Sequence, residues 1–172
     1  DPAYRPTINV NGYNGNGGTI NVDTSSFNLS SWQYFEAIGT QAGGNIAITA
    51  DTIDLAGGLV ATGATGGTVT TTTTGSLFAA ATAYINAGTW LVHAPSIAIA
   101  PTSGASPGPG AVLTDAALSS TLDGGTLVQL YADAALSPGA SGSIHIEDGV
   151  SIVHATSDAA ALDLRATAGI YG

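Results

Sequence analysis

The sequence has no cysteine, methionine or lysine, and its two arginines are Arg5 and Arg165. Without cysteine there is no disulfide, no thiol nucleophile and no thiolate zinc site. Without lysine, Schiff-base chemistry and P-loop phosphate binding are excluded. Two arginines far apart in the sequence do not form the basic face that nucleic-acid phosphates require, so no nucleic-acid partner is expected.

Long apolar runs are also missing. A membrane-spanning helix needs about 20 continuous apolar residues, and no such window exists, so we expect no membrane insertion. No initiator methionine, signal peptide or lipidation motif is recognisable, which predicts a processed product or a piece of a longer chain. The net charge is −10. With 44% apolar residues and a mean hydropathy of +0.30, the chain has enough material for a core, so disorder is not expected.

What the sequence does contain is a series of short runs in which apolar and small polar residues alternate. Alternation with β-branched residues is typical of strands. Glycine pairs and Pro-Gly or Asp-Gly steps separate the runs and indicate turns. The runs predict strands over residues 7–10, 19–22, 45–50, 52–55, 68–72, 90–92, 96–100, 126–131, 143–147, 150–153 and 161–166.

Evidence for helices is limited to two segments. Asp115–Leu122 has the composition for one or two helical turns, and Phe27–Ile38 is expected to be a short helix or an aromatic-packed loop. The threonine run Thr70–Thr74 is expected to be a strand whose outward hydroxyls are solvated.

The strands recur with a loose period. Gly-Gly-Thr-Ile-Asn-Val at 17–22 is followed by similar words at 43–48, 66–71 and 124–129. The first three begin roughly 23 to 26 residues apart, which lies in the range of solenoid repeats. We therefore predict an all-β chain, a parallel β-helix (β-solenoid) with short corner loops. Residues 1–172 would form a single segment, with a less regular part at 1–42 that holds an aromatic loop and regular coils over 43–172. About seven coils would give a rod roughly 35 Å long.

Four sequence words from Gly88 onward resemble the repeats of filamentous haemagglutinin-like adhesins, the exoproteins of two-partner secretion. These words, in the family's order, occupy residues 88–99, 117–130, 142–152 and 161–170. The resemblance implies a right-handed β-helix, an extracellular or cell-surface location and a structural or adhesive role. The family's Asp-Pro is His93-Ala94-Pro95 here, and the Asn-Pro-rich signatures of its secretion domain are absent. The resemblance is therefore to the shaft and not to the export signal.

Several β-helices cleave polysaccharides, so catalytic groups need attention. Asp163 and Arg165 share one face of an alternating strand, which favours a surface ion pair over a catalytic base. Asp51 and Asp54 point to opposite faces and do not form an evident carboxylate pair. A dyad assembled from neighbouring coils stays open as an alternative. No catalytic residue is assigned, and the chain is expected not to be an enzyme.

Metal and cofactor sites are not indicated either. His93, His145 and His154 are expected to be surface imidazoles, with His145 and His154 facing outward. The glycines of Asn11–Gly18 lack the aspartates of a calcium-binding nonapeptide repeat. Weak calcium binding by the acidic surface stays open, as does glycosylation at the sequon of Asn28.

Trp32, Tyr34 and Phe35 form the one aromatic group that could bind a ligand. They predict either a platform for glycans, including cell-surface glycans, or a loop that packs on the core.

A solenoid leaves unpaired strand edges at both ends. The sequence closes at Ile170-Tyr171-Gly172 without a charged capping segment. We therefore expect end-to-end continuation, either into further repeats of the same chain or by strand docking between subunits. The predicted function is a shaft or repeat unit of a surface adhesin or fibre. The alternative is a carbohydrate-binding or polysaccharide-degrading β-helix protein.

Overall fold

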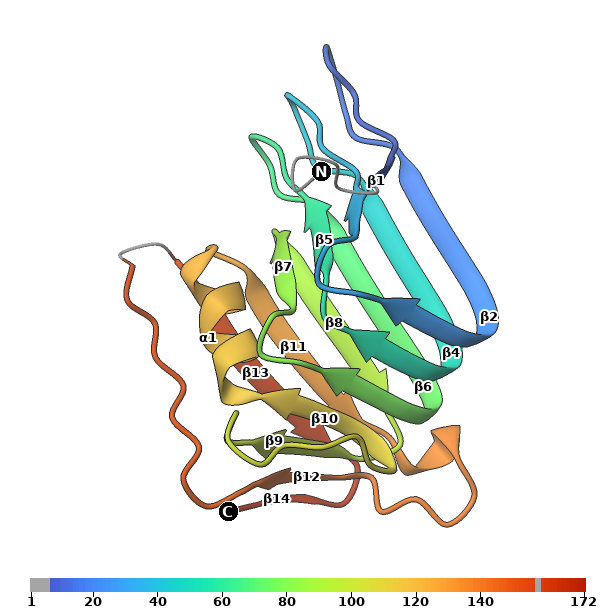
Figure 1. Cartoon of the computed structure of the whole chain (residues 1–172), viewed down its shortest axis with the longest axis vertical. Coiled ribbons are helices and arrows are strands. Elements are labelled where there is room, and N and C mark those ends of the chain that lie inside the picture. Colours follow the sequence, from blue (N-terminus) through green and yellow to red (C-terminus); the bar gives the residue numbers. More distant parts are fainter. Residues whose placement is uncertain (1–6, 157–158) are drawn as a thin grey trace.

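The computed structural model describes residues 7–156 and 159–172 (Figure 1). It is mostly parallel β, with 52% strand and 7% helix. The strands and helices are β1 (Thr7–Asn9), β2 (Thr19–Leu29), β3 (Tyr34–Glu36), β4 (Asn45–Leu55), β5 (Gly58–Ala61), β6 (Thr68–Ala79), β7 (Tyr84–Ala87), β8 (Thr89–Ala94), β9 (Ile97–Ala100), β10 (Gly110–Thr114), α1 (Asp115–Asp123), β11 (Leu127–Ala132), the 3-10 helix η1 (Ala134–Leu136), β12 (Ser143–Ile146), β13 (Ala161–Ala166) and β14 (Gly169–Tyr171). The prediction of a predominantly parallel β chain is confirmed.

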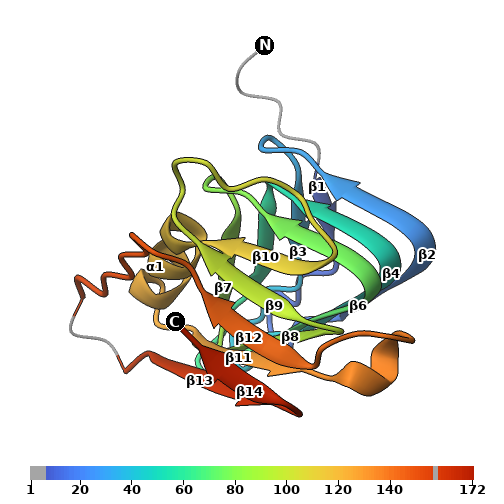
Figure 2. The ribbon, with the colours of Figure 1, turned by 90° about the horizontal axis from the view of Figure 1, so that it is seen from below.

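The strands stack in parallel ladders on three sides (Figures 1 and 2). Strands β2, β4 and β6 are long and bent, so that each contributes its first half to one side and its second half to the next. The first side has the order β2-β4-β6-β8-β11-β13, and the second side has the order β2-β4-β6-β10-β9-β12-β14. The third side is the separate sheet β1-β3-β5-β7.

The register shows how the chain returns to the same place in each layer. On the first side, Thr19 aligns with Asn45, then Thr68, Thr89, Leu127 and Ala161. The glycine pairs of the repeated segments lie directly before β2, β4 and β6, and the pair of the fourth segment lies before β11 with Thr126 between. The chain turns into the first side at these points. The repeat prediction therefore located the strand starts correctly.

Most predicted strands are present, although several boundaries differ. The predicted strands 45–50 and 52–55 are the two halves of the single bent strand β4. Two predictions were wrong. Residues 150–153 are not a strand. Phe27–Ile38 is neither a helix nor a loop but the end of β2, a turn and β3, because Phe27 and Phe35 are ladder positions of two different sides.

The core lies inside the three sides and consists of stacked aliphatic ladders. Along the first side, Ile46, Val69, Trp90 and Val128 lie one above the other and are fully buried. Successive residues of a strand point to opposite faces, so every second position enters the core. This explains the alternating burial of β4, β6, β8 and β11.

The threonine run lies in β6, as predicted, and its side chains alternate between the two faces of the strand. Thr71 and Thr73 point inward and are fully buried, whereas Thr70 and Thr72 are partly exposed. Both inward hydroxyls are satisfied. Trp90 Nε1 donates to Thr71 Oγ1 at 3.2 Å, and Thr73 Oγ1 donates to the carbonyl of Asp51 at 2.8 Å.

Strand β10 is inserted out of sequence order. The chain forms β9 first, and then a loop over residues 101–109 brings it back so that β10 lies between β6 and β9. Gly110 begins β10 with φ of +79°, and an added Cβ would lie 2.6 Å from the carbonyl oxygen of Ser96, so glycine is required here. The second side consequently has one strand more than the first.

Helix α1 replaces the next strand of the third side and contacts β7. Thr114 caps it, because its Oγ1 accepts from the amide of Ala117 at 3.2 Å and donates to the carbonyl of Ala79 at 3.1 Å. Ala117, Leu118 and Leu122 face the core. The prediction of a short helix at 115–122 is confirmed.

Candidate functional site

The stack has two ends, which we call the N-terminal edge (β1 and β2) and the C-terminal edge (β13 and β14). Among the described residues, β2 pairs only with β4 and β1 only with β3. Within the same residues, β13 pairs only with β11 and β14 only with β12. Each edge therefore presents backbone donors and acceptors that no neighbouring described strand satisfies.

Both edges also expose aliphatic side chains that belong to core ladders. Ile8 continues the ladder of Phe35, Leu59 and Ile85, yet it is 55% exposed while Leu59 and Ile85 are fully buried. At the opposite edge, Ile170 lies beside the fully buried Ile144 and is 47% exposed. These residues are exposed because the ladder stops, and not because their side chains point outward.

The C-terminal edge carries the one arginine that the structure describes. Arg165 donates to Asp163 Oδ2 from Nη2 at 2.6 Å and from Nε at 3.0 Å, as the shared face predicted. The hydrogen bond and the charge of Asp163 raise the pKa of Arg165. The Arg165 side chain is 66% exposed. At the N-terminal edge, the exposed Asp23 occupies the same ladder position on β2 that Arg165 occupies on β13.

The predicted aromatic platform is divided between two faces of the chain. Phe35 packs inward against Phe27, with ring centroids 5.5 Å apart in an edge arrangement. Tyr34 lies on the outer face of β3 over Gly58, where an added Cβ would lie 2.3 Å from the tyrosine ring. Trp32 lies in the turn between β2 and β3 and is 67% exposed.

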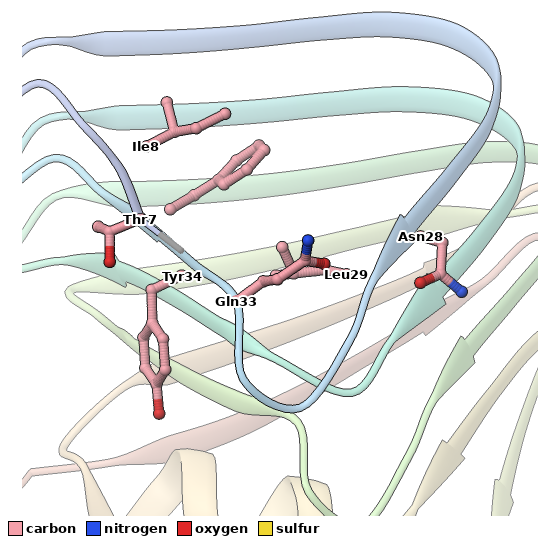
Figure 3. Close-up of a pocket in the computed structure, with 7 residues that line it drawn as sticks. Thr7, Ile8, Asn28, Leu29, Gln33 and Tyr34 are labelled. Atoms are coloured by element: carbon pink, nitrogen blue, oxygen red, sulfur yellow. The ribbon is translucent and has the colours of Figure 1, made fainter. Parts of the chain in front are cut away.

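A hollow of about 410 Å³ lies beside this turn at the N-terminal edge (Figure 3). In Figure 3 the side chain of Tyr34 points away from that of Ile8. The lining residues are Thr7, Ile8, Asn28, Leu29, Gln33, Tyr34 and Phe35. The hollow is therefore part of the open end of the core, with amide side chains at its rim.

The three histidines lie apart. His93 stacks on Tyr131 with ring centroids 4.9 Å apart, and its Nε2 is 3.3 Å from Asp133 Oδ2. His145 is exposed on β12, and His154 Nδ1 is 3.5 Å from Asp123 Oδ1. Among residues 7–156 and 159–172, no group of three or more histidine, aspartate or glutamate side chains could hold a metal ion. No helix in this part of the chain is long and apolar enough to cross a membrane.

The segment 150–156 runs along the outer side of α1 (Figure 1) and is bound there by side chains of the helix. Three side-chain oxygens on one face of the helix each accept a hydrogen bond from a backbone amide of the segment. Asp115 Oδ2 accepts from the amide of Ser151 at 3.2 Å. Ser119 Oγ accepts from the amide of Val153 at 3.0 Å, and Asp123 Oδ1 accepts from the amide of Ala155 at 2.6 Å. Four helical residues rise about 6 Å and two extended residues about 6.6 Å, so the two spacings match. The residues predicted as a strand at 150–153 therefore have no regular secondary structure, and their partner is a helix.

Asp115 is the first residue of this row. Its Oδ1 also accepts from the hydroxyl of Thr102 at 2.6 Å and from the amide of Thr102 at 2.8 Å. The bond from the Thr102 hydroxyl is the main cause that lowers the pKa of Asp115 below its ordinary 3.8. The four-residue spacing of Asp115, Ser119 and Asp123 places them on one helix face. It could have indicated the contact with segment 150–156 only if the helix and its neighbouring segment were already known.

The comparisons with known proteins found no match. No family model matches the sequence, and neither a curated protein nor a solved structure is similar to the chain.

Proposed function

We propose that this chain is a structural segment of an extracellular adhesin or fibre, a right-handed parallel β-helix that continues end to end with further copies. One observation carries this proposal. At both edges the core ladders stop at side chains that remain half exposed, Ile8 at one end and Ile170 at the other. A further strand on the second side would bury Ile170 and satisfy the edge of β14, and a further element on the third side would bury Ile8.

The ladders support the solenoid part of the proposal. Equivalent positions recur in successive layers, and bent strands carry the chain from the first side to the second. The resemblance to filamentous haemagglutinin-like repeats fits this arrangement. Its four segments fall on β8 and β9, on α1 and β11, on β12, and on β13 with the start of β14. Strands β8, β11 and β13 are neighbours on the first side, and β9, β12 and β14 are neighbours on the second. The scarcity of lysine and arginine leaves few sites for trypsin-like proteases, which suits an exposed surface polymer.

Sedimentation velocity of the wild-type chain, from low micromolar to near-millimolar concentration, tests the proposal. We expect the sedimentation coefficient to rise with concentration, without a plateau at a dimer. Ile170→Asp should shift association to higher concentration, because it places a charge in the contact. His145→Asp adds the same charge on an outward side chain of the neighbouring strand and serves as the matched control. A wild-type chain that stays monomeric throughout would refute self-association.

Glycan binding is a second candidate, and the exposure of Trp32 favours it. An exposed indole beside a hollow with Asn28 and Gln33 at its rim offers a stacking surface and amide groups for sugar hydroxyls. Phe35 does not belong to such a site, because it packs against Phe27. A glycan array with wild type and Trp32→Ala tests this candidate, which fails if the two proteins give the same binding pattern.

A further inference from the structure

We propose that the C-terminal edge of one copy binds the N-terminal edge of the next in a single register, in which Ala161 lies beside Thr19 and Arg165 beside Asp23. This inference rests on the proposed end-to-end function and specifies its interface. The occupant of the edge is a second copy of this chain.

The register follows from the ladders within one copy. On the first side, Thr19 and Ala161 are the two ends of a single row of aligned residues. Continuing that row by one strand places Thr19 of the next copy against Ala161. On the second side, Phe27 and Ile170 are the two ends of another row. The same step therefore places Phe27 of the next copy against Ile170.

The inward side chains that this register brings together are all aliphatic. Leu162 and Leu164 of β13 are partly buried core residues, and this register places them against Ile20 and Val22. Aliphatic pairs then continue into the next copy. A shift by one residue would turn every inward side chain outward, so the alternation excludes it.

The charges select among the remaining registers. Arg165 is the one arginine in the described part of the chain, and its side chain is 66% exposed. In the proposed register it lies between Asp163 of its own strand and the exposed Asp23 of the next copy. A shift by two residues would place Arg165 beside Asn21 or Ser25 and would lose this ion pair. In a chain with net charge −10, like charges oppose association, so one correctly placed arginine has a strong influence on register.

The shape of the two edges is compatible with this contact. Strand β2 bends at Ser25 between its aligned halves, and β13 passes to β14 through Thr167 and Ala168. Both edges thus offer two consecutive strands that meet at a corner. The contact joins different surfaces of the two copies, so it repeats without closing a dimer.

Cysteine cross-linking tests the register, since the chain has no native cysteine. Thr19→Cys with Ala161→Cys places two outward cysteines on adjacent strands, whose backbones lie about 4.8 Å apart across the contact. That spacing suits a disulfide. Within one copy, the two positions lie at opposite ends of the six-strand row β2-β4-β6-β8-β11-β13. We expect mild oxidation to give a ladder of covalent multimers on non-reducing gels.

The control moves one cysteine by two residues on the same face. Asn21→Cys with Ala161→Cys would hold the thiol-bearing residues roughly 8 Å apart in the proposed register, beyond disulfide reach. We expect little cross-linking. Equal or preferential cross-linking of this control would overturn the register, while association of the wild type would still support the proposed function.

A charge exchange provides an independent test by sedimentation. Asp23→Arg alone and Arg165→Asp alone each place like charges across the contact, and each should weaken association about tenfold or more. An equimolar mixture of the two variants restores an opposite-charge pair at every junction, so association should recover. If the wild type associates but the single variants match it, the register is wrong. If the wild type never associates and Thr19→Cys with Ala161→Cys gives no ladder, the interface and the self-association of the proposed function both fail.

Discussion

The buried hydroxyl of Thr71 gives the sharpest test of how the strands face the core. Thr71 lies fully buried on β6 and accepts a hydrogen bond from Trp90 Nε1 on the adjacent strand β8. Thr71→Val keeps the shape of the side chain but leaves the indole N–H without its partner. An unsatisfied buried donor costs about 1–3 kcal/mol, and the added methyl group returns up to about 0.8 kcal/mol. Taking about 2 kcal/mol, the middle of that range, for the orphaned donor, we expect a net loss of about 1–2 kcal/mol.

Thermal unfolding followed by circular dichroism measures this loss. For a chain of this length, about 1 kcal/mol shifts Tm by roughly 2–4 °C, so Thr71→Val should lower Tm by about 2–8 °C. Thr70→Val is the matched control. The Thr70 side chain is adjacent in sequence but faces outward, so this substitution should change Tm little. Trp90→Phe in the Thr71→Val background removes the orphaned donor, so the double variant should lose less than the sum of the two single variants. A neutral Thr71→Val, or an equally harmful Thr70→Val, would refute the assigned orientation of β6.

Three other predictions follow from the same geometry. Ile144→Ala should lower the free energy of unfolding by about 2–5 kcal/mol. Ile170→Ala should lower it clearly less in the monomer, because Ile170 is 47% exposed. Equal losses, measured by urea unfolding of dilute protein, would contradict the position of β14 at an edge. Phe35→Ala should destabilise the chain through its contact with Phe27, whereas Trp32→Ala should leave Tm unchanged. For Asp115, whose pKa is lowered by Thr102, the stabilisation is complete above the ordinary value of 3.8 and is lost as pH falls through the lower folded-state pKa. The protection factor of the Ser151 amide, which is its intrinsic exchange rate divided by its observed rate at the same pH, should therefore fall on acidification. Asp115→Asn should lower the protection factor in the same way at neutral pH, and a protection factor that does not change with pH would argue against the carboxylate contact.

The local pattern of the sequence predicted the strands well where similar sequence segments pair with one another, as β2, β4 and β6 do. The words at 17–22, 43–48 and 66–71 precede aligned strands, because alternation and a glycine turn are both local signals. The helix at α1 was also predictable, since alanine and leucine follow a threonine cap and a glycine pair ends the segment.

Other features depend on contacts between distant segments and could not be read from local pattern. Strand β10 lies between β6 and β9 because of a long return loop, which no alternation encodes. The burial of Thr71 depends on Trp90 reaching it from the next layer. The extended run 150–153 was predicted as a strand because periodicity reports an extended backbone and not the partner to which it bonds.

The aromatic group shows the same limit at the candidate site. Trp32, Tyr34 and Phe35 are close in sequence, which suggested a common surface. Tyr34 and Phe35 are adjacent residues of β3 and therefore point to opposite faces, whereas Trp32 lies in the turn before the strand. Only the ladder alignment of Phe35 with Leu59 reveals that this ring belongs to the core.

The stacked arrangement itself is tested most directly by a distance measured along the first side. Spin labels at Thr19→Cys and Ala161→Cys, in labelled chains diluted with unlabelled wild type, report the separation within one copy by electron–electron double resonance. Five strand intervals of about 4.8 Å predict a backbone separation near 24 Å, lengthened or shortened only by the label linkers. A narrow distribution around that value would support a parallel stack with two separate ends. A short separation, with residues 19 and 161 on neighbouring strands of one copy, would contradict it and remove the basis for end-to-end assembly.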